Sequence, residues 1–335
     1  MSNQEQSNPA PVKNLKGLLR FCMEATRSED APNSSNPEIF EAMTEDRKKW
    51  LEEALTSMTV SPVERMQLCV KSIEEAVPDT EAGTEQQVQA ITELQDWAED
   101  LDIAGDFIKI NGLRVVPKLL SSEVSELRWR CLELLGNIAQ NNPTGQTALL
   151  TLKLLPAILM LVDTDPNPLV QVKALYAVSC LVRSNSEAQL QLMAYDGLSV
   201  LVRALHSEEE KLRMKATFLM SAICNSNPAL KDSLVEAGVI EQLVSLLKEE
   251  HDSSHEHILS TMLTIVADHA TAQKKCRGLD IPTLLCQKIR SLDGQDQFKE
   301  EKDYAEQILE VLNQPPRGDT ATSAGTNQLL DCDGF

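Results

Sequence analysis

Three histidines lie close together at His251, His255 and His257, and imidazole is the side chain most often used to bind metals or to transfer protons near neutral pH. Histidines four residues apart can share one face of a helix. In the run HEHIL, however, Leu259 occupies the position where a zinc-protease motif needs its second histidine, and no Asp or Cys completes a convincing site. We therefore expect these histidines to be polar residues of a loop and a first helical turn, with neither a metal nor a cofactor.

Other catalytic chemistry is not indicated either. The sequence contains no phosphate-binding loop, dinucleotide-binding fingerprint or nucleophile elbow, and acidic runs such as Glu208–Glu210 are typical of solvated loops. The net charge of −20, from 31 basic and 51 acidic residues, disfavours binding to the phosphates of nucleic acids. With 42% apolar residues the chain can bury a core, so we expect a folded protein that is not an enzyme.

The elements that position these residues come from an internal repeat. Four stretches share one template, NGLRVVPKLL, LKLLPAILML, DGLSVLVRAL and AGVIEQLVSLL, which begin at Asn111, Leu152, Asp196 and Ala237; RGLDIPTLLCQKI from Arg277 is a partial fifth copy. Each is followed by a longer segment with apolar residues at helical spacing. A period of about 42 residues with two helices per unit is typical of armadillo and HEAT repeats and excludes tetratricopeptide and ankyrin repeats.

The longer segment decides between the two repeat types. Residues 131–139 (CLELLGNIA) follow the armadillo pattern, and the two following copies agree with it. Gly136, Ser179 and Ser221 place a small residue in one register, as close packing between helices requires. The sequence therefore predicts an all-α fold, an armadillo-repeat right-handed solenoid with helical caps and disordered termini.

The segments on either side of the repeats are expected to cover the exposed ends of the solenoid. We expect a disordered segment over 1–40, a helical cap over 41–105, armadillo repeats over 106–290, a capping helix over 291–313 and a disordered tail over 314–335. The predicted capping helices are 44–58, 61–77 and 84–103 before the repeats and 300–313 after them. Ser61 and Pro62 supply an N-cap and a first-turn proline for the second of these helices.

The cellular compartment is indicated by the cysteines and the N-terminus. The eight cysteines lie far apart, without a C-x-x-C pair or a metal-binding spacing, which is typical of free thiols in a reducing compartment. The first residues, MSNQEQSNPAPVKN, lack the apolar run of a signal peptide. The longest apolar stretch, Leu149–Val162, is too short to span a bilayer. We expect a monomeric, cytosolic protein that binds neither membranes nor nucleic acids.

The long helices of an armadillo solenoid line its concave face, so their outward residues are candidates for binding a partner. On successive helices these candidates are Trp129, Glu133 and Asn137, then Tyr176, then Phe218, then His257 and Thr261. Three cations, Arg130, Lys173 and Lys215, share one register beside them. Two interpretations remain open: the cations lie over the neighbouring repeat, or they form a row aimed at an acidic partner, with the aromatic residues as hot spots.

Residues 12–26 (VKNLKGLLRFCMEAT) form an apolar island between polar stretches. Its apolar residues Leu15, Leu18, Leu19 and Phe21 are flanked by lysine and arginine. One interpretation is a short amphipathic helix that docks on its own domain. The other is a tethered linear motif that binds a groove in another protein.

Several longer runs are far more specific than a generic armadillo pattern. They are NLKGLL at 14–19, DIAGDF at 102–107, LRWR at 127–130, VKALYAVSCLVR at 172–183, DGLSVLVRA at 196–204 and EHILSTM at 256–262. With these runs the chain resembles, over nearly its whole length, the HspBP/Fes family of armadillo-type nucleotide exchange factors for heat shock protein 70 chaperones.

The resemblance implies a co-chaperone without catalytic chemistry. The concave face would bind the nucleotide-binding domain of cytosolic heat shock protein 70 and loosen its lobes, so that ADP leaves faster and client peptide is released. The resemblance also implies that residues 12–26 mimic a client and compete for the chaperone's peptide groove. Two alternatives remain: a generic armadillo adaptor or scaffold, and an inhibitor of the chaperone in which exchange is secondary.

Overall fold

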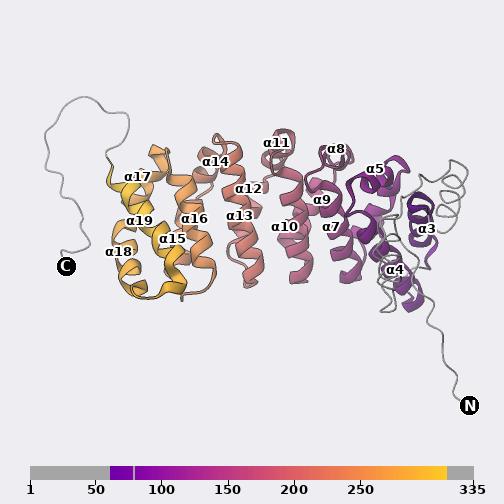
Figure 1. Cartoon of the computed structure of the whole chain (residues 1–335), viewed down its shortest axis with the longest axis horizontal. Coiled ribbons are helices and arrows are strands. Elements are labelled where there is room, and N and C mark those ends of the chain that lie inside the picture. Colours follow the sequence, from indigo (N-terminus) through magenta and orange to yellow (C-terminus); the bar gives the residue numbers. More distant parts are fainter. Residues whose placement is uncertain (1–60, 78–79, 315–335) are drawn as a thin grey trace, which may run out of the picture.

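The computed structural model describes residues 61–77 and 80–314, and within these residues the secondary structure consists of helices joined by turns and bends. The helices stack in one elongated row that runs from α3 at one end to α19 at the other (Figure 1). Four long helices, α7, α10, α13 and α16, stand side by side along this row in chain order.

Two short helices and one long helix recur along the row. Before the first unit come α3 (Pro62–Glu75) and α4 (Glu81–Trp97). The first unit contains α5 (Leu101–Lys109), η1 (Gly112–Val115) with α6 (Val116–Leu120), and α7 (Ser125–Ala139); the second contains α8 (Pro143–Thr151), α9 (Leu155–Thr164) and α10 (Pro168–Val182). The third contains α11 (Ser186–Ala194), α12 (Gly197–Ala204) and α13 (Glu210–Ser226); the fourth contains α14 (Leu230–Glu236), α15 (Val239–Leu247) and α16 (Ser254–Val266). The last contains α17 (Ala270–Gly278), α18 (Ile281–Leu292), η2 (Asp296–Phe298) and α19 (Lys299–Asn313). This succession confirms the predicted armadillo-repeat solenoid.

From the second unit onward, each unit contains one helix that was not predicted from the sequence. The additional helices, α8, α11, α14 and α17, are short and follow the turn at the end of the preceding long helix. They bury few apolar side chains; in α17 only Ala272 and Cys276 are buried. A helix with so few buried positions leaves little periodicity in the sequence, which explains why these helices were missed.

A left-handed residue precedes the second helix of every unit. These residues are Asn111 (φ 57°), Lys153 (φ 54°), Asp196 (φ 56°), Gly238 (φ 83°) and Asp280 (φ 57°). Glycine adopts this conformation without strain, and Asn and Asp tolerate it better than other residues. The recurring feature of the NGL, DGL and AGV templates is therefore a backbone conformation, which different residue types can fulfil.

The helices before the repeats begin largely as predicted. Ser61 caps α3 as expected, because its hydroxyl accepts a hydrogen bond from the N–H of Glu64 (3.4 Å), and Pro62 occupies the first turn. The helix predicted at 84–103 is instead two helices, α4 and α5, because the Asp100 carboxylate caps a new helix by accepting from the N–H of Asp102 (2.9 Å). The predicted segments 1–40 and 44–58, and the predicted tail 314–335 apart from Gln314, lie outside the described residues.

A buried ion pair joins the first two long helices. The guanidinium of Arg128 in α7 donates two hydrogen bonds, of 2.7 and 3.0 Å, to the carboxylate of Asp165. The Asp165 side chain is only 2% exposed. Its carboxylate also accepts from the N–H of Asn167 (2.9 Å) at the start of α10. The carboxylate of Asp165 therefore both binds the backbone at the start of α10 and attaches this segment to α7 of the preceding unit.

The same arrangement recurs between α13 and α16 but not between α10 and α13. Arg213 in α13 donates to the carboxylate of Asp252 (2.6 Å), which also accepts from the N–H of Ser254 (2.8 Å). At the α10–α13 junction the corresponding residues are Gln171 and Ser207, which are both uncharged. The junction in the middle of the solenoid therefore lacks the ion pair that fastens the junctions on either side.

Gly136 in α7 confirms the small residue predicted in its register. A Cβ atom at this position would lie 2.2 Å from Cε1 of the Tyr176 ring in α10. The ring therefore packs directly on the backbone of α7, and no larger residue fits while Tyr176 stays in place.

This contact makes a substitution at Gly136 informative. We expect Gly136→Ala to lower the free energy of unfolding by about 2 kcal/mol, because overpacking outweighs the higher helix propensity of alanine. Gly105 in α5 is a matched control, since a Cβ there has no neighbour within 4 Å, and Gly105→Ala should instead stabilise by up to about 1 kcal/mol. Urea unfolding measures both, and an unchanged stability of Gly136→Ala would contradict the packing argument.

Within the described part of the chain, no single helix is long and apolar enough to cross a membrane. Helices α8 and α9 reach the necessary length and hydropathy only as a pair, and they are bent by 86° at the break between them. The cysteines of the described residues are free thiols: Cys69, Cys131, Cys180, Cys224, Cys276 and Cys286.

Candidate functional site

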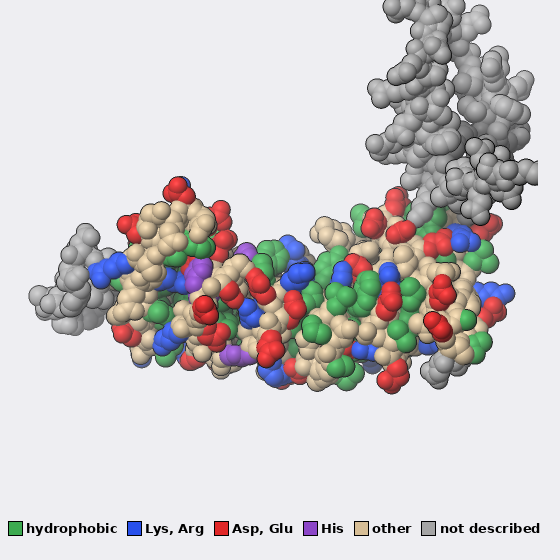
Figure 2. All heavy atoms as spheres, turned by 90° about the horizontal axis from the view of Figure 1, so that it is seen from below, with side chains coloured by type: hydrophobic (Ala, Val, Ile, Leu, Met, Phe, Trp, Pro, Cys, Tyr) green, Lys and Arg blue, Asp and Glu red, His purple; other side chains and the backbone are tan. Residues whose placement is uncertain are grey.

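The side chains predicted to meet a partner come from the four long helices. Seen from below, the solenoid is hollowed along one side between its two ends, with basic, acidic and hydrophobic side chains intermixed (Figure 2). We use the term long-helix face for a set of partly or fully exposed side chains on these helices or directly after them. They are Trp129, Arg130, Glu133, Asn137, Lys173, Tyr176, Arg183, Lys215, Phe218 and His257.

Thr261 does not belong to this face, and the prediction that it meets a partner is wrong. Its side chain is buried at 1% exposure. The hydroxyl lies within hydrogen-bond distance of the carbonyl oxygens of Thr217 (3.0 Å) and His257 (2.8 Å). Because four residues turn a helix about 40° past a full turn, counting by fours from His257 led to the inward side, whereas Ser260 is partly exposed.

Two of the predicted cations are neutralised within the chain. Arg130 pairs with Glu126 (2.9 Å), and its guanidinium lies 4.4 Å from the centre of the Trp129 ring. The Lys173 ammonium in α10 pairs with Glu133 in α7 and lies 5.9 Å from the same ring. For these cations the structure favours the first interpretation, in which they pack within the chain and over the neighbouring repeat.

Two other cations on the face have no carboxylate partner among the described residues. The Lys215 ammonium lies 5.5 Å from the centre of the Tyr176 ring, and the Arg183 guanidinium lies 5.2 Å from the centre of the Phe218 ring. Arg183 is exposed at the C-terminal end of α10. Arg183 was not predicted from the sequence because it lies outside the register of Arg130, Lys173 and Lys215.

These two cations border a pocket that lies along α10, with the α7–α8 segment on one side and α13 on the other. The pocket has a volume of about 550 Å³, and its lining, which includes Tyr176, Cys180, Arg183, Lys215 and Phe218, contains no Asp or Glu. Burial raises the pKa of the Tyr176 hydroxyl and that of the Cys180 thiol, so both stay neutral near pH 7. Phe218 is 54% exposed. The pocket thus combines positive charge with an exposed aromatic ring, a combination that suits a carboxylate-bearing partner.

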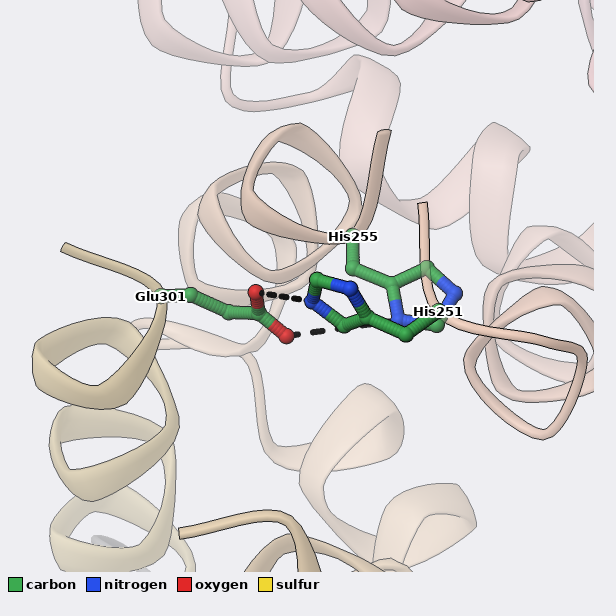
Figure 3. Close-up of side chains that lie close together, drawn as sticks. All are labelled: His251, His255 and Glu301. Atoms are coloured by element: carbon green, nitrogen blue, oxygen red, sulfur yellow. Dashed lines mark hydrogen bonds and ion pairs between the residues drawn. The ribbon is translucent and has the colours of Figure 1, made fainter. Parts of the chain in front are cut away.

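The histidines lie partly in an unexpected environment. His251 stays in the loop before α16, but His255 is buried at 2% exposure, and Figure 3 shows that both rings approach the carboxylate of Glu301 in α19. The donor atoms of the three residues come within 4.8 Å of one another. Lys288 of α18 lies among them, 2.7 Å from Nδ1 of His255 and 3.0 Å from Oε1 of Glu301. The cluster therefore already contains a cation, supplied by the chain itself.

Known proteins resemble this chain in sequence over most of its length. The family model of the "SIL1/FES1/HPBP1 C-terminal domain" matches residues 103–203 and 190–291, and the model "Nucleotide exchange factor Fes1" matches residues 15–107. The chain belongs to the SIL1/FES1/HPBP1 family. Hsp70-binding protein 1 of Mus musculus is 34% identical over 325 residues, which cover 93% of this chain and 89% of the mouse protein. The Homo sapiens protein of the same name is 33% identical, with 92% and 88% covered.

Solved structures agree with the fold of this SIL1/FES1/HPBP1 family member. A designed armadillo repeat protein has a TM-score of 0.61 at 22% identity and covers 74% of this chain and 99% of its own. Another, solved in complex with the peptide (KR)4, has a TM-score of 0.62 at 21% identity, with 74% and 99% covered. At these identities the likeness confirms the armadillo fold alone.

Proposed function

We propose that the chain is a nucleotide exchange factor for a cytosolic Hsp70 chaperone and that its long-helix face binds the chaperone's nucleotide-binding domain. Membership of the SIL1/FES1/HPBP1 family supports nucleotide exchange as the activity. The observation that carries the binding site is the pocket bordered by Arg183 and Lys215, because these cations lack a carboxylate partner within the described residues. The matching surface of the chaperone should therefore present Asp or Glu.

The proposed mechanism needs no catalytic residue. A nucleotide that contacts both lobes of its binding domain is held less tightly when the lobes are moved apart. A solenoid that binds one lobe and displaces the other therefore favours the open, ADP-free domain. Such coupling is reciprocal, so nucleotide must lower the affinity of the chaperone for this chain by the same factor.

Stopped-flow release of fluorescent ADP tests this function. We expect a saturating concentration of the full chain to accelerate release from Hsp70 at least several-fold, and to act in the same way on the isolated nucleotide-binding domain. Excess unlabelled ADP should weaken binding of the chain to that domain. Binding without accelerated release would favour the inhibitor instead, and the absence of binding would favour a generic armadillo adaptor.

The N-terminal motif is a separate part of the proposal, because residues 12–26 lie outside the described residues. We propose that Leu15, Leu18, Leu19 and Phe21 occupy the peptide groove of the chaperone after a client leaves. Replacing these four residues by Ser in the full chain should slow net client release and leave ADP release unchanged. If ADP release slows equally, the motif belongs instead to the surface that binds the nucleotide-binding domain.

We also propose that the protein acts as a monomer in the cytosol. The free thiols of the described residues support a reducing compartment. Four of them, Cys69, Cys131, Cys224 and Cys276, are buried, and burial raises the pKa of each. Such thiols act as small apolar residues of the core.

A further inference from the structure

We propose that His251, His255, Lys288 and Glu301 form an acid-sensitive latch, which holds the C-terminal helix α19 on the solenoid at neutral pH and releases it in acid. This inference does not depend on the chaperone. It concerns the last helix of the described chain, which packs on α16 and α18 and covers the apolar end of the stack.

Glu301 is the centre of the latch. Its side chain is buried at 3% exposure in the first turn of α19. The carboxylate accepts from Nε2 of His251 at 2.8 Å and lies 3.0 Å from the ammonium of Lys288. The ring of Phe298, just before α19, packs on the edge of the His251 ring with 4.6 Å between the ring centres. The loop before α16 and helix α18 thus both bind the first turn of α19.

The contact between Lys288 and His255 can form in only one protonation state of His255. The Lys288 ammonium can only donate, and it lies 2.7 Å from Nδ1 of His255. His255 must therefore be neutral, with its proton on Nε2. A second proton would have to sit on Nδ1, directly against the ammonium. Since both side chains are buried, two adjacent cations would face one carboxylate, and the contact would break.

The surrounding charges do not cancel this effect. Burial is the main reason that the pKa of His255 lies below its usual value, followed by the charge of Lys288; Glu301 and Asp252 act in the opposite direction, and His251 adds to the lowering. The other ionisable groups near the cluster are Glu256 and His257 on α16 and Glu300 on α19. Asp252 is already paired with Arg213. Neutral His255 is therefore the form that the folded chain stabilises.

The direction of the pH dependence follows from this shift. A histidine in the unfolded chain takes up its proton near pH 6.5, whereas His255 in the folded chain takes it up at a lower pH. The latch is thus fully effective above about pH 6.5 and weakens as the pH falls below that value. A metal ion is not needed to explain the cluster, because the Lys288 ammonium already contacts both His255 and Glu301.

Amide hydrogen exchange of the full chain tests the latch. Protection of the α19 amides, corrected for the intrinsic exchange rate, should fall several-fold from pH 7.5 to pH 5.5, because His255 binds its proton less readily in the closed latch than in the released state. His255→Gln should remove this dependence, because glutamine can still accept from Lys288 and does not titrate. His257→Gln is the matched control two residues further along α16 and should behave like the unchanged chain.

A second variant keeps the proposal testable if His255→Gln does not fold. Lys288→Met removes the repelling cation but keeps Glu301, whose Oε1 lies 4.0 Å from Nδ1 of His255. Burial still lowers the pKa of His255 in this variant, but the charge of Lys288 no longer adds to the effect, so protection of α19 should fall less steeply with pH than in the unchanged chain. The proposal is overturned if either variant keeps the original pH dependence. Stabilisation of the unchanged chain by Zn²⁺ alone at pH 7.5 would also overturn it, in favour of a metal site.

Discussion

Reversing the charges of Arg183 and Lys215 together, with Arg183→Glu and Lys215→Glu, is expected to weaken binding to the Hsp70 nucleotide-binding domain by about 100-fold. Both cations border the pocket along α10, and no carboxylate pairs with either among the described residues. The substitution would replace attraction to an acidic partner by repulsion between like charges, which costs several kcal/mol at an interface. Isothermal titration calorimetry measures the affinity, and ADP release should be impaired in parallel.

Two controls distinguish this effect from a general change of charge. Lys248→Glu reverses an exposed cation at the end of α15 and should change the affinity by less than about threefold. Arg130→Ala with Lys173→Ala removes cations that Glu126 and Glu133 already neutralise, and the loss should be much smaller than for the pocket pair. If this second pair causes the larger loss, the contact surface lies at α7 rather than at the pocket.

The second large effect is expected on stability. Asp165→Ala should lower the free energy of unfolding by about 3 to 5 kcal/mol, because it leaves the buried charge of Arg128 without its carboxylate partner. The Arg128 side chain is only 10% exposed. The substitution also removes the acceptor for the N–H of Asn167 at the start of α10. Denaturant unfolding followed by circular dichroism measures the change.

Asp163 provides a control two residues away. It forms an ion pair with Arg203, also through two hydrogen bonds, of 2.8 and 2.9 Å, but the two side chains are 26% and 52% exposed. We expect Asp163→Ala to cost less than about 1 kcal/mol, because exposed pairs contribute little. Equal losses for Asp163→Ala and Asp165→Ala would show that burial is not what makes the Arg128 pair important.

The fold could be predicted because a repeat presents the same evidence several times. Each copy of the template supplies another turn and another amphipathic helix, so the period and the helix type reinforce each other. The register of the small residues was equally informative, and Gly136 confirms it. The short helices such as α17 left too little apolar periodicity to be recognised, since most of their residues are polar.

The candidate site was harder to predict, because whether a cation forms an ion pair depends on acidic residues that are distant from it in sequence. Arg130, Lys173 and Lys215 occupy one register, but only Lys215 lacks a carboxylate partner among the described residues. No pattern within one helix reveals whether an acidic residue of the next unit will reach a given cation. The position of Glu301 beside His255 depends in the same way on how the last helix folds back on α16.

The missing ion pair in the middle of the solenoid has an elastic consequence. A stack of units that contact only their neighbours bends where neighbouring units are least strongly joined. The buried Arg128 pair and the Arg213 pair stiffen two junctions. At the α10–α13 junction Gln171 and Ser207 replace such a pair, and the Asp163–Arg203 pair that links α9 to α12 there is exposed. The pocket with Arg183 and Lys215 reaches across this junction. The curvature of the whole solenoid and the width of the pocket should therefore change together. A partner bound in the pocket would act at the junction where the solenoid bends most easily.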